Sequence, residues 1–372
     1  MKIVSNVIIA IMIAFSIYGI IDKLFLGGKK GVGEQFEKGV SMFAPLFISM
    51  AGIIALVPVL AYFINSTLSP LYISLGLDPS LAVSSIIAID MGGYQLSKAV
   101  ALEPLIGEWA AIMFGTTLGT TIVFSIPVGL STIKKEDIPS FSKGVLYGLA
   151  ATPIGCFVGG IILGVPIVAI CKNMIIPIML SLTIILCLRF FPNKTIKVFS
   201  IFSKLINIIA LLGLALALIK DYILLPICDA SLLNISNIPF FNVLGSSEEG
   251  IIVAGQICIV LSGALPFIYC ISKWLKKPLE KLSHRFNMSN AGITGFLLSS
   301  ANNIAMFSTL GEMNEKEKVM NVAFAVSSSF IIGDHLAFVA ANSANMIVPM
   351  IISNLLGGVI AVILVNTLNK ND

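Results

Sequence analysis

The chain has 372 residues, of which 57% are hydrophobic and 11% charged, and its mean hydropathy is +1.00. Soluble globular domains carry about 25% charged residues, and no soluble fold could bury this much apolar surface. The net charge of +4 comes from lysines in several separate connections, which excludes the clustered basic face of a nucleic-acid-binding protein. The six cysteines lack the paired spacing of a zinc or redox site, so we expect no metal and no cofactor.

About 9–11 apolar segments separated by short polar connections cover the chain, and a membrane-spanning helix needs roughly 20 mainly apolar residues. The sequence therefore predicts an all-α, polytopic integral membrane bundle that forms one domain over residues 1–372. The first segment lacks a small-residue cleavage site, and we expect it to be retained. Continuous spans are expected at 4–21, 41–64, 111–130, 145–170, 174–188, 198–218, 251–274, 319–338 and 340–365.

Two further apolar segments are interrupted halfway along. Residues 81–101 contain Asp90 followed by two glycines, and residues 291–310 contain Asn302 and Asn303. Glycine accepts backbone geometries that other residues resist. Irregular backbone at membrane depth is tolerated only inside protein or beside a water-filled cavity, so each segment is expected to be a broken or re-entrant helix.

Lysine and arginine gather in the connections 22–40, 189–197 and 273–285 and in the one after residue 130, which the positive-inside rule places in the cytoplasm. Residues 65–80 and 221–250 contain neither and are expected outside. A re-entrant 81–101 segment reconciles these sides, because an odd number of crossings must link residue 80 to residue 134. The second half repeats this pattern in the opposite direction, which predicts an inverted repeat with halves at 41–131 and 251–366. A repeated Ala-Val-Ser-Ser, at 82–85 and 325–328, pairs different segments and is interpreted as coincidence.

Ionisable side chains inside apolar segments are the first candidates for a transport site. An ionised Asp costs about 2.5–3.5 kcal/mol at a helix centre, so it should face protein, water or a cation. Asp90 is either a site residue or a structural acid at a helix end. Asp334 can hold an ammonium group while His335 tunes it or relays a proton. The alternative for this pair is a structural hydrogen bond between the two side chains.

Uncharged polar side chains are the second candidates. Asn302 and Asn303 suit a hydroxyl or amide partner, although such residues also join helices inside membranes. The run Gly115–Thr121 contains glycine and threonine only, apart from one leucine. We expect that run to serve close helix packing rather than to line a pathway.

Six segments combine polar residues with apolar surroundings in a way that apolar bias alone would not produce. They are SIIAIDMGGYQL (85–96), TIVFSIPV (121–128), PIGC (153–156), KPL (277–279), ANNIAMF (301–307) and NVAFAVSSSFIIGDHLAFVAAN (321–342). Together they resemble the EutH family of ethanolamine-utilisation transport proteins over nearly the whole chain. The resemblance implies a multi-pass permease or facilitator in the bacterial cytoplasmic (inner) membrane that supplies ethanolamine to an ammonia-lyase pathway.

Ethanolamine is an alkyl ammonium near neutral pH, as a lysine side chain is, and it carries one hydroxyl. The two acids would bind the amine, the two amides the hydroxyl, an aromatic ring would form a cation–π wall, and the imidazole would tune the acid beside it. The residues expected to bind substrate are Asp90, Asp334, Asn302, Asn303, Tyr94 and His335.

Three other classes of function were weighed. An enzyme is not expected, because the sequence contains no nucleophile with its base and no ligand set such as HExxH. A structural membrane protein is disfavoured, because buried acids would then be a cost without a use. A carrier or channel for another small amine or polar solute stays open, with an aromatic cage as the mark of a choline site. The expected partners are the small-molecule substrate and the lipid bilayer, with no nucleic acid and the oligomeric state left open.

Overall fold

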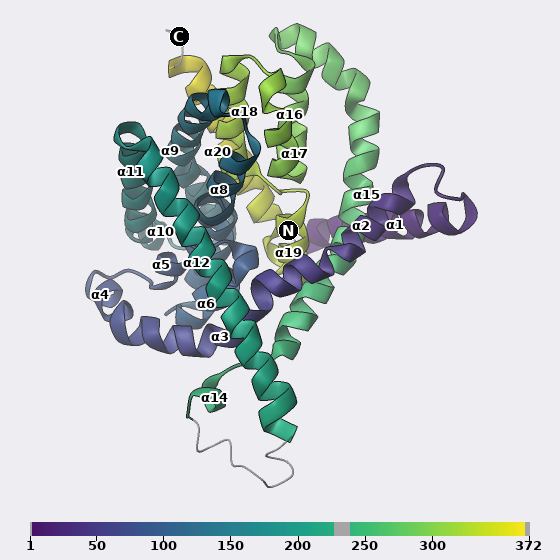
Figure 1. The fold of residues 1–372 in the computed structure, drawn as a ribbon. Helices are drawn as coiled ribbons and strands as arrows, with labels where there is room; N and C mark the ends of the chain where they lie inside the picture. The colour runs from purple at the N-terminus through teal and green to yellow at the C-terminus, as the bar shows by residue number, and fades with distance from the viewer. Residues whose placement is uncertain (1, 227–238, 369–372) are drawn as a thin grey trace.

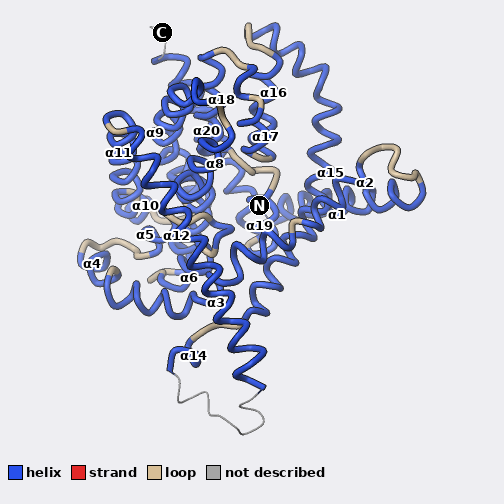
Figure 2. Tube along the Cα trace, in the orientation of Figure 1, coloured by secondary structure: helices blue, strands red, loops and turns tan. Residues whose placement is uncertain are grey.

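The computed structural model describes residues 2–226 and 239–368 (Figure 1). Within these ranges the chain is helical throughout, with turns and loops between helices and no strand (Figure 2). Eight helical runs are long and apolar enough to cross a membrane, which confirms the polytopic helical bundle. These runs are Lys2–Phe25, Val32–Thr67, Pro104–Thr132, Lys135–Leu163, Ile167–Phe190, Pro192–Leu224, Phe240–Phe286 and Ala344–Leu368.

The first half of the chain consists of long spans and short broken helices. In chain order these are α1 (Lys2–Phe25), α2 (Val32–Ser41), α3 (Phe43–Thr67), α4 (Ser69–Ser74), α5 (Ser80–Ser84), η1 (Ile89–Met91), α6 (Gly93–Val100), α7 (Pro104–Met113), η2 (Gly115–Gly119), η3 (Thr121–Ser125), α8 (Ile126–Thr132), η4 (Lys135–Asp137), α9 (Ile138–Leu163), α10 (Ile167–Asn173) and α11 (Ile175–Phe190).

The second half is built in a similar way. It contains α12 (Pro192–Ile219), η5 (Lys220–Leu224), α14 (Pro239–Val243), α15 (Ser247–Phe286), α16 (Asn290–Ala301), α17 (Asn303–Ser308), η7 (Leu310–Glu312), α18 (Glu315–Ser328), α19 (Asp334–Asn342), η8 (Ala344–Met346) and α20 (Ile347–Leu368).

Helices α9, α18 and α20 pack tightly against one another through small residues. A Cβ atom at Gly155 of α9 would lie 2.4 Å from the carbonyl oxygen of Ser353 on α20. A Cβ atom at Gly148 would likewise lie 2.4 Å from the Cβ atom of Val326 on α18. Close backbone approach through glycine is a common basis of helix association in membranes, where burial of apolar surface gives little drive.

Asp78 closes the first interrupted segment into a re-entrant hairpin. Its carboxylate accepts hydrogen bonds from the backbone N–H groups of Ser80 (2.9 Å) and Leu102 (3.0 Å), so the chain returns to the point where it entered. Between these ends α5 stops, η1 forms one turn, and Gly92 takes a left-handed conformation (φ 81°) before α6 begins. The predicted interruption of residues 81–101 is confirmed.

Glu317 closes the second interrupted segment in the same manner. This buried carboxylate accepts from the N–H groups of Ser289 (2.6 Å) and Asn314 (3.2 Å). Helix α16 ends at the extended residue Asn302 (φ −160°), where α17 begins, so the interruption of residues 291–310 is also confirmed. In Figure 1, α5 and α6 lie in the lower half of the molecule and α16 and α17 in the upper half.

The prediction of a continuous span at 319–338 is wrong. Helix α18 ends at Ser328, residues 329–333 are irregular, and α19 begins at Asp334. The N–H groups of Phe330 and Ile332 donate to the carbonyl groups of Ser299 and Ser300, at 3.1 and 3.0 Å, and so pair with the end of α16. A neighbouring helix therefore satisfies the backbone groups that the break releases.

Three other predicted boundaries also need correction. The expected span 145–170 is divided at Gly164 (φ 80°), where α9 ends before α10. The expected span 340–365 begins later, because α20 starts at Ile347. The basic residues at 273–285 lie on the end of α15, a 40-residue helix that continues through two prolines, rather than in a loop. Proline is tolerated in membrane helices because neighbouring groups satisfy the freed backbone.

The ends of the helices sort into two groups in Figure 1. The α8–α9, α11–α12 and α15–α16 connections lie at the upper end, while α4 and α14 lie toward the lower end. Three of the four lysine-rich regions thus share one end, whereas the α1–α2 connection projects to the side.

At the upper end Lys318 contacts Asp137 and Glu315, each at 2.7 Å. The two carboxylates raise the pKa of Lys318, and the Lys318 ammonium lowers the pKa of Glu315.

Candidate functional site

The three helix breaks are joined around α19. The irregular residues 329–333 pair with the end of α16, and α19 packs against η1 of the first hairpin. A Cβ atom at Gly333 would lie 2.2 Å from the carbonyl oxygen of Ala301, so this approach requires glycine. The chain thereby brings together Asp90, in η1, and Asp334, the first residue of α19.

Asp90 and Asp334 form a pair of carboxylates without a positive partner. Each side chain is half-buried, and the two lie near enough to repel each other electrostatically. Asp90 accepts a hydrogen bond from its own backbone, and in the described ranges neither carboxylate forms an ion pair or bonds to another side chain. The start of α19 gives partial stabilisation to Asp334 through its backbone N–H groups. A pair of acids inside the helical bundle is therefore available to a cation.

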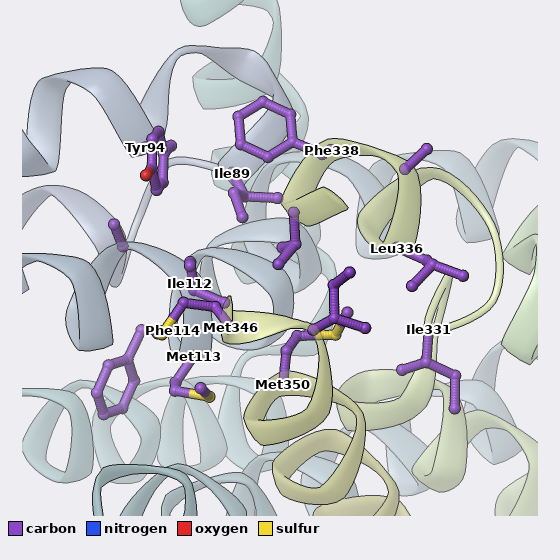
Figure 3. Close-up of a cluster of buried hydrophobic side chains, with 14 of the residues drawn as sticks. Ile89, Tyr94, Ile112, Met113, Phe114, Ile331, Leu336, Phe338, Met346 and Met350 are labelled. Carbon is purple, nitrogen blue, oxygen red and sulfur yellow. The ribbon is translucent and has the colours of Figure 1, made fainter. Parts of the chain in front are cut away.

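An aromatic pair follows the acids in the chain. Tyr94 lies on α6, four residues after Asp90 and beyond the left-handed Gly92, and Phe338 follows Asp334 by four residues on α19. The two rings meet edge-to-face at 5.5 Å. Figure 3 shows both rings beside Ile89 within the buried apolar cluster. Residues four apart share a helix face, so Asp334 and Phe338 lie on one face of α19.

The next turn of α6 changes the expectation for Tyr94. The Lys98 ammonium lies 5.0 Å from the centre of the Tyr94 ring and donates a hydrogen bond of 3.2 Å to its hydroxyl. The ring face that was expected to form a cation–π wall for substrate thus already contacts a cation from the same helix. On α19 the equivalent position is Asn342, whose amide donates to the backbone of Phe338 at 2.9 Å.

His335 has a different partner from the acid beside it. Its ring is buried, with Nε2 3.3 Å from the hydroxyl oxygen of Thr120. Thr120 also donates its own proton to the carbonyl group of Gly115 (2.7 Å), which favours the neutral tautomer in which Nε2 donates to the Thr120 hydroxyl. The structure therefore places the imidazole against the π-helical part of the α7–α8 span, and it forms no hydrogen bond to Asp334 in the described contacts.

The two amides of the second hairpin have unequal roles. Asn302 caps α17, because its side-chain oxygen accepts from the N–H of Ile304 at 2.8 Å. Asn303 is fully buried and donates to the hydroxyl of Ser125 at 2.9 Å. The side-chain oxygen of Asn303 has no partner among the described residues, which leaves it as a free hydrogen-bond acceptor.

Comparison with known proteins identifies the family of the chain. The family model described as "Ethanolamine utilisation protein, EutH" matches residues 4–368. The chain belongs to the EutH family. It is 40% identical over 359 residues to the probable ethanolamine permease EutH of Listeria monocytogenes, covering 96% of this chain and 92% of that protein. The corresponding values are 36% over 389 residues for the protein of the same name from Escherichia coli (96% and 94%), and 38% over 358 residues for the uncharacterised protein YxeR of Bacillus subtilis (96% and 93%). No solved structure matches the chain. Family membership and the helical membrane bundle point to a transporter rather than an enzyme.

Three polar side chains of this EutH-family chain were missed by the sequence reasoning. Gln95 follows Tyr94 on α6, and both polar atoms of its amide are buried without a partner among the described residues. The hydroxyl groups of Ser85 and Ser329, at the ends of α5 and α18, are buried and unpartnered in the same way. A buried unsatisfied polar group costs about 1–3 kcal/mol, so these atoms favour a ligand or water beside them.

A serine pattern could have revealed these positions. Consecutive serines precede each of the three breaks, at 84–85, 299–300 and 327–329. Serine at a helix end competes for backbone hydrogen bonds and so favours termination over a continued helix.

The glycine–threonine run 115–121 behaves as expected for packing: its threonines are buried, and Thr116 and Thr117 donate to carbonyl groups one turn earlier on α7.

Proposed function

We propose that this EutH-family protein carries ethanolamine, as its ammonium ion, across the bacterial cytoplasmic membrane. The observation that supports this most is that Asp90 and Asp334, on separate broken helices, lie near enough to interact electrostatically and have no cationic partner among the described residues. Two such acids attract one ammonium group and would hold it by charge-assisted hydrogen bonds. The Listeria and Escherichia relatives are each named as a probable ethanolamine permease, which favours ethanolamine as the amine.

The hydroxyl of ethanolamine needs a neutral partner near the acids. In this proposal it bonds to the free side-chain oxygen of Asn303, while the unpartnered amide of Gln95 is a second candidate. Four non-hydrogen atoms allow a binding free energy of about 6 kcal/mol at most. The dissociation constant should therefore be no tighter than tens of micromolar, in keeping with a carrier that must also release its substrate.

A carrier for a quaternary amine such as choline is the second candidate, and the aromatic geometry disfavours it. A choline site requires several ring faces around the cation. Here Tyr94 and Phe338 contact each other, and the face of Tyr94 contacts Lys98. A primary ammonium, which donates three hydrogen bonds, fits the acid pair better than a methylated cation that donates none.

We also propose that the two halves, 41–131 and 251–366, form an inverted repeat. In this arrangement α3 corresponds to α15, and the hairpin closed by Asp78 corresponds to the hairpin closed by Glu317. The support is that each long helix is followed by a hairpin and then by further helices, and that the hairpins lie in opposite halves of Figure 1. Inverted repeats with broken helices place substrate sites at their interface.

The decisive experiment measures uptake of labelled ethanolamine into proteoliposomes that contain the purified protein. Asp90→Asn and Asp334→Asn keep the shape of each side chain but remove its charge, and each should lower apparent affinity ten- to a hundred-fold, because a hydrogen bond to a charged group contributes about 1.5–3 kcal/mol. Glu280→Gln is the matched control, since Glu280 is an exposed acid near the end of α15. Parent-like uptake by both Asp variants would refute the assignment of the acids to the amine.

The pH dependence of transport tests the charge of the transported species. The amine should titrate close to a lysine side chain, near pH 10, so the neutral form that crosses lipid unaided falls about ten-fold for each unit of acidification. The ratio of uptake with protein to uptake by empty liposomes should therefore rise as the pH falls from 9 to 6. A ratio that rises toward alkaline pH instead would exclude transport of the ammonium form.

A further inference from the structure

A groove at the upper end of the molecule lies apart from the acid pair. Its volume is about 910 Å³, and it is bounded by α9, α11 and α20. All three helices belong to candidate membrane spans and run side by side in Figure 1. The groove therefore opens between spans and not within the layer that contains the helix breaks.

The walls of the groove are apolar. Leu146 on α9, Leu188 on α11 and Leu364 on α20 line it, and it extends along α9 from Ile138 to Ala150. Those twelve steps along a helix correspond to about 18 Å, which is enough for a lipid headgroup and the first part of one acyl chain. Such walls offer no hydrogen bonds to water, so an acyl chain is the occupant that this part of the groove accepts.

Basic and polar groups also line the same groove. Lys143 and Arg189 both line it, together with Ser142 and Asn193, and none of its lining residues is acidic. Arg189 is exposed at the end of α11. A guanidinium group binds phosphate oxygens in a bidentate manner, and basic pockets between transmembrane helices bind anionic lipid headgroups.

We propose that this groove binds one anionic phospholipid, with its phosphate at Arg189 and one acyl chain along Leu146 and Ala150. The exposed guanidinium group, the apolar side chains beside it and the position between three spans all match a single lipid molecule. The lysine-rich end is the one expected in the cytoplasm, and the cytoplasmic leaflet carries the negative surface potential of anionic lipids. The site does not depend on the identity of the transported substrate.

The test compares two lipids on the full-length protein. Protein purified in a neutral detergent is titrated with phosphatidylglycerol or with phosphatidylcholine of the same acyl chains, and bound lipid is counted by native mass spectrometry. The parent should retain one phosphatidylglycerol with an affinity at least about five-fold higher than for phosphatidylcholine, which is the ratio that one basic residue contributes near a membrane surface. Arg189→Gln should remove most of this preference, because it weakens phosphatidylglycerol more than phosphatidylcholine, whose own choline already balances the charge of its phosphate.

The chain supplies an unusually close control. Arg285 is the other arginine of the sequence, is also followed by phenylalanine, is exposed, and ends α15 outside the groove. Arg285→Gln should therefore leave both affinities unchanged. Ala150→Phe, which narrows the apolar part, should weaken both lipids by the same factor. Equal binding of the two lipids by the parent, or an equal loss of phosphatidylglycerol in the Arg189 and Arg285 variants, would overturn the proposal.

Discussion

Asp78 and Glu317 close two hairpins that enter the bundle from opposite halves, and they do so with the same chemistry. Each carboxylate accepts backbone N–H groups from both ends of its hairpin. The contents of the hairpins differ, because the first carries the unpaired acid Asp90 and the second carries Asn302 and Asn303, whose bonds are mostly satisfied. Under the proposed function, different residues of these segments close the hairpins and bind the substrate, so variants can separate the two roles.

The largest effects are expected at the two clamps. Asp78→Asn and Glu317→Gln replace an acceptor oxygen by an NH₂ group that faces backbone donors, which should lower the free energy of unfolding by about 3 kcal/mol in each case. Thermal unfolding of the detergent-purified proteins would measure the loss. Glu312→Gln is the control, because Glu312 is exposed on the short helix that ends the second hairpin. An unchanged midpoint for either clamp variant would show that its hairpin is held by other contacts.

A smaller and more informative effect is expected within the second hairpin. Asn302→Ala removes the cap of α17 and should cost about 0.5–2 kcal/mol of stability, while leaving the affinity for ethanolamine unchanged. Asn303→Ala should weaken ethanolamine binding about five-fold, because one neutral hydrogen bond contributes about 1 kcal/mol. Thermal unfolding with and without ethanolamine separates the two effects. If the Asn302 variant loses affinity and the Asn303 variant keeps it, the roles assigned to the two amides are reversed.

The sequence predicted both interrupted segments because a polar residue inside an apolar run is visible without a structure. It could not predict the break at 329–333, since Phe330, Ile331 and Ile332 read as part of a span and the hydrogen bonds that stabilise the break come from α16. The repeated Ala-Val-Ser-Ser has a common position in the structure: at 82–85 and at 325–328 it ends a helix just before an irregular stretch that leads to an acid. The similarity of the two segments depends on where the helices end, and composition does not predict those positions.

The candidate site could likewise be predicted only in part from the sequence. The sequence selected Asp90 and Asp334 because charge is rare in these segments, and the structure brings them together. It paired His335 with Asp334 because they are adjacent in the chain, whereas adjacent residues on a helix point in different directions and His335 contacts Thr120 instead. Gln95 was missed because an amide near a helix end is common, and only its burial without a partner marks it.

The smallest expected effect concerns Lys98, which has no counterpart in the second hairpin. Lys98→Met keeps the aliphatic length but removes the ammonium group that contacts the Tyr94 ring, and it leaves that ring face open to another cation. A cation–π contact contributes about 0.5–1 kcal/mol at an exposed site, so choline should inhibit ethanolamine uptake about two- to five-fold more strongly in the variant than in the parent. Lys276→Met, at an exposed position of α15, is the control. The apparent affinity for ethanolamine itself should change less, because the acid pair binds its ammonium. Inhibition by choline that is equal in all three proteins would show that Lys98 does not restrict the cations that reach Tyr94.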